Sequence, residues 1–202
     1  MGFKILSFFN SSEPVVADVA SILDSLKHIK QATIDFDTCI NSWDGGILGA
    51  FSLVKRANDV ITDTNNTATL AKTAAPFAHD EAKQIIDLIQ DIADVVGKVV
   101  DTVDTDQAKF KRVKYIGDTA AIAILRRLKY TIEAMADAFV PKTPAEILPI
   151  TDSIAEQFDR HLARGIAIFE TSGAGHGEGK EVNEEKVPTD LSSTVEIAQV
   201  KA

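Results

Sequence analysis

Cysteine is almost absent from this 202-residue chain, in which Cys39 is the only one. A single thiol excludes an intrachain disulfide and a cysteine-rich metal cage. Because Cys39 lies in an apolar helical pattern, we expect it to pack as a small hydrophobic side chain. Long apolar runs are also missing, since nothing approaches the about 20 continuous apolar residues of a transmembrane helix. We therefore expect no transmembrane segment.

Positive charge is scarce as well. Lys and Arg together number 21 against 30 Asp and Glu, which leaves a formal net charge of −9. A general nucleic-acid binder needs a basic surface to neutralise phosphates. The composition therefore predicts no nucleic-acid partner.

The sequence lacks the common catalytic motifs. It contains no G-x-S-x-G elbow and no glycine-rich phosphate loop, and no pair of histidines has the spacing of a zinc-binding helix. In "RHLARG", His161 could act as a general base, but a histidine at the boundary of a core is the commoner arrangement where no nucleophile accompanies it. We expect no enzyme, no cofactor and no metal site. The four histidines are His28, His79, His161 and His176.

Apolar residues recur at intervals of three and four along the chain, and strand signals are weak, so the sequence predicts an all-α protein. The first helix is expected to begin near Pro14, with Ser12 as its cap, and to reach about Trp43. The turn residues of "SWDGG" end it. A second helix is expected from Ile47, with a weaker continuation to Pro76 because Thr and Asn are poor helix formers.

The third helix is expected to begin near Asp80 as its N-cap and to carry "IIDLIQDIADVVGKVVDTV", residues 85–103. This segment has a helical apolar stripe, but Ile86, Ala93 and Val100 make the stripe wider than docking on one partner requires. The surplus face must contact other helices of the chain or something that is not protein.

Two further helical regions complete the pattern. One spans residues 105–139, with a break expected at Gly117-Asp118. The spacing of "TPAE", residues 143–146, is typical of a capping box. The main fifth helix is expected to start near Ile150, because Pro149 interrupts a regular helix before it.

The composition changes abruptly after Ser172. Residues 173–202 are rich in Gly and charge and contain no aromatic residue, so they cannot bury enough apolar surface to offset their ordering entropy. We expect a flexible N-terminus over residues 1–13, a single antiparallel bundle of about five helices over residues 14–172, and a disordered acidic tail.

Seven basic residues are gathered in a short stretch of this acidic chain. Such a surface could meet anionic lipid headgroups or a carboxylate at a cavity mouth. The alternative, which most charge runs follow, is a solvated helix surface balanced by neighbouring acids. The cluster consists of Lys109, Lys111, Arg112, Lys114, Arg126, Arg127 and Lys129.

The order of these features over residues 14–171 resembles the fungal hydrophobic surface-binding protein A family, which includes the antigenic cell-wall galactomannoproteins. The resemblance is carried by the D-V-x-x-I-x-x-x-L-x-x-I helix at Asp18 to Ile29, the aromatic residue and glycine turn at Trp43 to Gly46, and the Thr-rich stretch "TDTNNTATLAKTAAPF". The late segment "LPITDSIAEQFDRHLARGIAIF" is also similar.

The resemblance implies a helical bundle that is not an enzyme, that encloses a fatty acid or other long-chain lipid in an apolar cavity, and that adsorbs to hydrophobic surfaces. The surplus face of residues 85–103 would then line the cavity, for which we expect several hundred Å³. Each buried methylene of an acyl chain contributes roughly 0.8 kcal/mol of binding free energy, so a lipid can bind without any chemical motif. The candidate lining residues are Phe51, Ile89, Ile92, Val96, Ile124, Leu128, Phe158 and Leu162.

Two alternatives remain open. The candidate residues could be plain core of a solid helical bundle that serves as a structural or interaction protein without a ligand. The protein could instead be an amphipathic surfactant whose helical bundle opens at an oil interface and exposes its apolar stripes. The compartment and the oligomeric state are open too: family members are usually secreted or resident in the cell wall, whereas the opening "MGFKILSFFNSSEP" is a poor export signal and leaves the cytoplasm as a second location.

Overall fold

The computed structural model describes residues 16–113 and 117–173, and all regular structure within these ranges is helical. The expected all-α class is therefore confirmed. The elements are α1 (Val19–Ser42), α2 (Ile47–Thr73), α3 (His79–Thr105), α4 (Gln107–Arg112), α5 (Gly117–Phe139), a 3-10 turn η1 (Val140–Lys142) and α6 (Leu148–Gly173).

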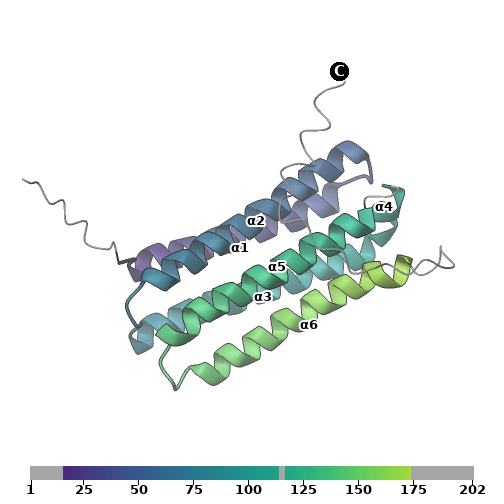
Figure 1. Cartoon of the computed structure of the whole chain (residues 1–202). Coiled ribbons are helices and arrows are strands. Elements are labelled where there is room, and N and C mark those ends of the chain that lie inside the picture. Colours follow the sequence, from purple (N-terminus) through teal and green to yellow (C-terminus); the bar gives the residue numbers. More distant parts are fainter. Residues whose placement is uncertain (1–15, 114–116, 174–202) are drawn as a thin grey trace, which may run out of the picture.

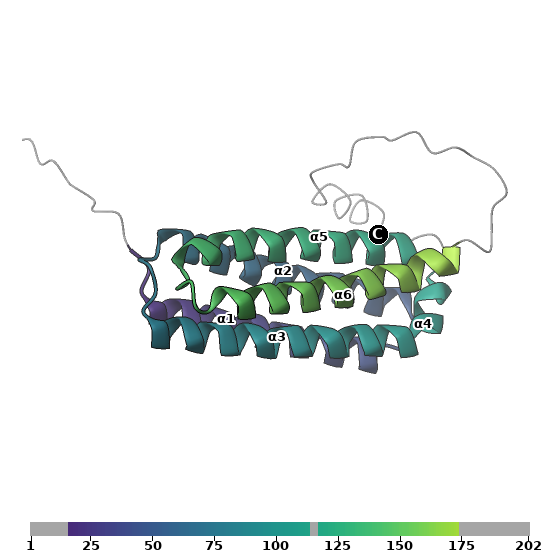
Figure 2. The same cartoon turned by 90° about the horizontal axis from the view of Figure 1, so that it is seen from below.

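Five long helices lie side by side, and the short α4 lies at one end of the bundle, named here the α4 end (Figures 1 and 2). Each long helix packs on two others, so that they form a closed ring in the order α1, α2, α5, α6, α3. With helix axes 8–10 Å apart, the centre of a five-membered ring lies about 8 Å from every axis, farther than in a four-helix bundle. Side chains must be long to fill that centre.

The helices α2 and α5 begin at the same end of the bundle and run in the same direction. At the α4 end, Arg112 Nη1 donates to the carbonyl oxygen of Asp44, just before α2. At the opposite end, Lys142 Nζ donates to the carbonyl oxygen of Ala74, just after α2. These two hydrogen bonds tie the connections before and after α5 to the two ends of α2.

The first helix begins later than the sequence pattern predicted. Asp18 is its N-cap, and the Asp18 carboxylate accepts a hydrogen bond from the backbone N–H of Ser21 at 2.7 Å. This hydrogen bond lowers the pKa of Asp18. The predicted cap Ser12 and the predicted start at Pro14 lie outside the described residues.

The second helix was expected to weaken in its Thr- and Asn-rich second half. It instead runs unbroken to Thr73. The hydroxyls of Thr64 and Thr67 donate to the carbonyl oxygens of Val60 and Asp63, both at 2.8 Å, which satisfies these side chains inside the helix. Both threonines are buried. Tertiary burial therefore outweighs their low helix propensity.

The third helix begins at His79, and its N-cap is Ala78 rather than the predicted Asp80. The backbone N–H of Ala78 donates to the Glu81 carboxylate at 2.8 Å, so the acidic residue of the first turn satisfies the end of the helix. The wide apolar face of α3 is buried against α1 on one side, α6 on the other and the interior of the ring between them.

Two predicted boundaries in the second half of the chain are wrong by a few residues. The expected break at Gly117-Asp118 lies earlier, because α5 already begins at Gly117, and residues 114–116 are outside the described part. The expected capping box at residues 143–146 does not start a helix. Thr143 instead follows η1 and donates from its hydroxyl to the carbonyl oxygen of Phe139 at 3.0 Å, and α6 starts at Leu148.

Aromatic side chains close the α4 end of the ring. The rings of Trp43 and Phe110 meet edge to face with centroids 4.9 Å apart, and Phe110 meets Phe169 in the same manner at 5.2 Å. The indole N–H of Trp43 donates to the carbonyl oxygen of Gly46 at 2.8 Å. Trp43 thereby joins the α1–α2 turn to α4 and to the end of α6.

Replacing Gly49 by alanine is expected to destabilise the fold by about 1–2 kcal/mol. A Cβ atom at this position of α2 would lie 2.7 Å from Nε1 of the buried Trp43 ring. Overpacking costs about 1–3 kcal/mol, and the better helix propensity of alanine offsets up to about 1 kcal/mol. Urea unfolding monitored by far-UV circular dichroism measures the change. Ser52→Ala, at an exposed position of the same helix, is the control, and an equal effect of both substitutions would contradict the expectation.

Candidate functional site

An apolar cavity of about 150 Å³ lies inside the helical ring toward the α4 end. All five long helices contribute side chains to its wall, together with Trp43 and Phe110. From α3 come the valines of the wide apolar face that the sequence pattern could not assign to a partner: Val96, Val99, Val100 and Val103. The surplus apolar face of α3 is therefore shared between neighbouring helices and the cavity.

Exposed lining side chains mark the mouth of the cavity along the first half of α2, which packs against α5. Ile47 and Phe51 line the cavity, yet they are 58% and 60% exposed, so they form its rim. The rim continues along α2 to Val54, which is 37% exposed, and Ile124 of α5 lines the cavity as well. Leu48 lies beside this rim and is 80% exposed, the most exposed large hydrophobic side chain in the described part of the chain.

Five of the eight candidate residues from the sequence line this cavity: Phe51, Val96, Ile124, Leu128 and Leu162. The other three, Ile89, Ile92 and Phe158, are buried in the core nearer the opposite end of the bundle, and the cavity does not reach them. Helical periodicity identifies which face of a helix points into the ring. It does not tell at which position along the bundle axis the centre of the ring is left empty.

Sequence reasoning missed most of the α2 and α5 wall. Several of the missed residues are small and occupy inward-facing positions, where a short side chain leaves space in the ring. Small residues within an apolar stripe are one signal of such space, but buried alanines such as Ala71 and Ala82 also occur away from the cavity. The missed small residues are Ala50 and Ala57 of α2 and Ala120 and Ala121 of α5, and Gly165 is a further small lining residue on α6.

The cavity is smaller than the several hundred Å³ expected for a typical ligand site. Leu125 of α5 and Leu162 of α6 are both buried and extend toward the middle of the ring. Their side chains take up part of the central volume that a five-membered ring creates. The enclosed space therefore suits a segment of a long ligand.

Three of the six described members of the basic cluster, Lys109, Arg126 and Lys129, pair with local acids. Arg126 pairs with Glu170 at 3.0 Å, and Lys129 pairs with Asp159 at 2.9 Å. The hydrogen bond to Asp159 raises the pKa of Lys129. This arrangement agrees with a solvated, balanced surface for much of the cluster. Lys114 lies outside the described residues.

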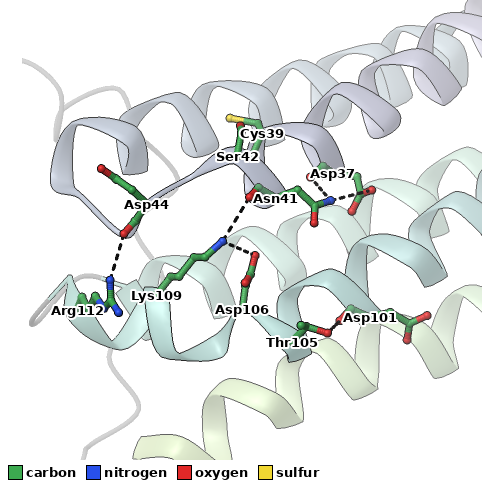
Figure 3. A network of polar contacts seen from close by, with 10 residues as sticks. All are labelled: Asp37, Cys39, Asn41, Ser42, Asp44, Asp101, Thr105, Asp106, Lys109 and Arg112. Carbon is green, nitrogen blue, oxygen red and sulfur yellow. Dashed lines mark hydrogen bonds and ion pairs between the residues drawn. The ribbon is translucent and has the colours of Figure 1, made fainter.

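Two members of the cluster attach α4 to the α1–α2 turn (Figure 3). Lys109 Nζ pairs with Asp106 at 2.7 Å and donates to the carbonyl oxygen of Asn41 at 3.4 Å. Arg112 Nη1 donates to the carbonyl oxygen of Asp44 at 3.3 Å. These contacts fix the position of α4 against the end of α1 and the α1–α2 turn.

A second, polar groove of about 370 Å³ lies on the outer surface between α1 and α2. Its charges compensate one another, because Arg56 lies 3.8 Å from both Asp35 and Asp59. Partial burial raises the pKa of Asp63, which also borders this groove. The groove is wide open to solvent, and seven of its eight lining residues have polar or charged side chains.

Within residues 16–113 and 117–173, no three His, Cys, Asp or Glu side chains gather as metal ligands would. His161 is half-buried on α6 and faces Gly97 of α3. In the same ranges, none of the helices combines the length and the apolarity that crossing a bilayer requires.

Several solved structures share this fold. AfMp4p in complex with palmitic acid superposes with a TM-score of 0.73 at 16% identity, over 75% of this chain and 99% of that one. Ligand binding domain 1 of the Penicillium marneffei MP1 protein, complexed with arachidonic acids, gives 0.69 at 20% identity, over 75% and 99%. Domain 2 of the same protein, with multiple arachidonic acids, gives 0.70 at 17%, over 77% and 97%.

A search of curated proteins gave no match. The family model described as hydrophobic surface binding protein A matches residues 19–141, which is more than half of the chain and extends from α1 through α5 into η1. The family resemblance stated from the sequence is therefore confirmed. This chain belongs to the hydrophobic surface binding protein A family.

Proposed function

We propose that this protein binds a fatty acid or a similar long-chain lipid, without catalysis, in the cavity inside the helical ring. The observation that carries the proposal is an apolar cavity that opens to solvent through a rim of exposed apolar side chains. Neighbours with the same fold have palmitic or arachidonic acid bound. We also propose that residues 14–172 form the complete binding unit.

The size of the cavity determines how a ligand would lie. A cavity of about 150 Å³ accommodates one benzene in an engineered protein, so the enclosed space takes a segment of an acyl chain. The rest of the chain would lie along Ile47, Phe51 and Val54 at the mouth, where exposed apolar surface is available. Each buried methylene contributes roughly 0.8 kcal/mol.

The direct test is to identify lipid carried by the protein. The full chain, purified without detergent, is extracted and analysed by mass spectrometry, and delipidated protein is titrated with a fluorescent fatty-acid probe. Stoichiometric lipid in the extract, or probe binding that fatty acid displaces, is expected. Absence of both would refute the proposal.

A series of saturated fatty acids from C8 to C16 is expected to bind with steadily increasing affinity. Burial of roughly 0.8 kcal/mol per methylene corresponds to about a fourfold gain for each added carbon while the chain continues to gain buried surface. Displacement titrations at one pH and salt concentration measure the series. A solid bundle without a ligand site, the alternative function, would show no dependence on chain length.

A second activity follows from the rim. Leu48 and its neighbours Ile47 and Phe51 place exposed apolar surface at one end of the molecule. We propose that this stripe mediates adsorption to hydrophobic surfaces, and that the protein adsorbs with its helices intact. Adsorption and cavity binding can be separated because Leu48 does not line the cavity.

A further inference from the structure

A bound fatty acid must place its carboxylate outside the cavity wall. The residues that line the cavity are apolar apart from Thr33, whose hydroxyl already donates to the carbonyl oxygen of Ile29 at 2.7 Å. An ionised carboxylate buried without a partner is strongly disfavoured. This inference rests on the proposed function and concerns where the charged end of the ligand binds.

The arginines of the described chain differ in whether they have an acidic partner. Arg112 and Arg127 have hydrogen bonds only to uncharged oxygen atoms. Arg112 of α4 and Arg127 of α5 each directly precede a residue that lines the cavity, Val113 and Leu128. The other four arginines form ion pairs with carboxylates: Arg56, Arg126, Arg160 and Arg164.

Arg112 is the less available of the two. It donates to the Asp44 carbonyl oxygen, and its Cδ atom lies 3.1 Å from the position that a Cβ atom on Gly45 would occupy. Gly45 has φ of 87° in the α1–α2 turn, so this close approach is part of the turn. Arg112 therefore has a structural role, because it holds α4 against the α1–α2 turn.

Arg127 is exposed, and its only hydrogen bond in the described structure is a long one, from Nη1 to the amide oxygen of Asn58 at 3.5 Å. This contact crosses from α5 to α2. On α5, Arg127 lies three residues after the lining residue Ile124, and on α2, Asn58 lies four residues after Val54. Residues three and four apart are neighbours on a helix surface, so the Arg127–Asn58 contact lies beside the mouth.

We propose that Arg127 binds the carboxylate of the ligand, and that Asn58 supplies a second donor. The planar guanidinium of arginine can engage both oxygens of a carboxylate. The amide of Asn58 has two N–H donors, which it presents to an anion when the side chain rotates. The neighbouring Asp59 is engaged by Lys55 at 3.5 Å and by Arg56. The site thus selects free fatty acids over neutral lipids of equal length.

The test compares Arg127→Gln with Arg126→Gln in the full chain. Arg126 precedes it on the same helix but pairs with Glu170 of α6, which makes it a matched control. The affinities for palmitic acid and for hexadecanol are measured by displacement of a fluorescent probe. R127Q is expected to weaken palmitic acid about tenfold and to leave hexadecanol unchanged, whereas R126Q changes neither. R127K is expected to retain part of the affinity.

Three outcomes would overturn the inference, and they are distinguishable. If R127Q and the wild-type chain bind palmitic acid equally well, Arg127 does not bind the carboxylate of the ligand. A tenfold loss with Arg112→Gln, but not with R127Q, places the carboxylate at the other end of the mouth. Failure of the wild-type chain to bind either palmitic acid or hexadecanol refutes the proposed function itself, and this inference with it. Circular dichroism verifies that each variant is folded.

Discussion

Replacing Ala121 by phenylalanine is expected to weaken fatty-acid binding by roughly 100-fold. Ala121 lines the cavity from α5, and a cavity of about 150 Å³ is filled by one aromatic ring. The new ring would exclude about four methylenes of an acyl chain, which corresponds to roughly 3 kcal/mol. Displacement titration with palmitic acid measures the loss.

The same substitution two residues further along α5 is the control. Ala123 is exposed and does not line the cavity, so Ala123→Phe is expected to leave the affinity unchanged. A ring that fills empty apolar volume gains contacts, so Ala121→Phe should unfold at the same or a higher urea concentration than the wild type. Full affinity in a folded Ala121→Phe variant would show that lipid does not enter this cavity.

Replacing Leu48 by aspartate is expected to reduce adsorption to a hydrophobic surface at least tenfold. Leu48 is 80% exposed at the rim, and losing the burial of a leucine costs about 2 kcal/mol, before the cost of bringing a charge to the surface is added. The partition of the protein between buffer and a hydrophobic film measures the change.

Ile150→Asp is the matched control for this substitution. Ile150 is also exposed and also lies in the first turn of a long helix, α6, but at the opposite end of the bundle. An acidic residue in a first turn is compatible with helix stability in both cases. Equal losses with both substitutions would mean that adsorption has no preferred face. Palmitic acid binding should be unchanged in both variants, since neither residue lines the cavity.

The closed ring explains how a chain without any catalytic or metal-binding motif can hold a ligand. Four helices pack around an axis with little space between them, whereas five leave a centre that ordinary side chains fill incompletely. Small residues at the α4 end, such as Ala57 and Ala121, leave this centre unfilled. Larger ones, such as Phe139 and Ile154, are buried at the opposite end of the helices that carry them. The position of the cavity therefore depends on which side chains the five helices bring together at each level, since buried alanines such as Ala71 and Ala82 also occur away from it.

Local sequence signals predicted the helices well where one pattern, such as apolar periodicity or a turn motif, dominates the segment. Period-three-and-four apolar spacing predicted all five long helices, and the turn "SWDGG" predicted the end of α1 to within a residue. The helix starts were predicted less well. At α3, Glu81 satisfies the backbone N–H of Ala78, and a pattern search for an N-cap side chain selected Asp80 instead. Several residues compete for each helix terminus, and their geometry decides among them.

Sequence alone determined that this protein is a helical bundle with more apolar surface than simple packing requires, because helical periodicity is a property of neighbouring residues in the chain. Only the tertiary structure decided where that surface is used. Closure of the ring places Val96 of α3, Ile124 of α5 and Leu162 of α6 around one cavity. Ile89 of α3 instead lies in the packed core. Closure also brings Arg127 to Asn58, 69 residues apart in the chain. Such proximity depends on distances between helices, which no local pattern encodes.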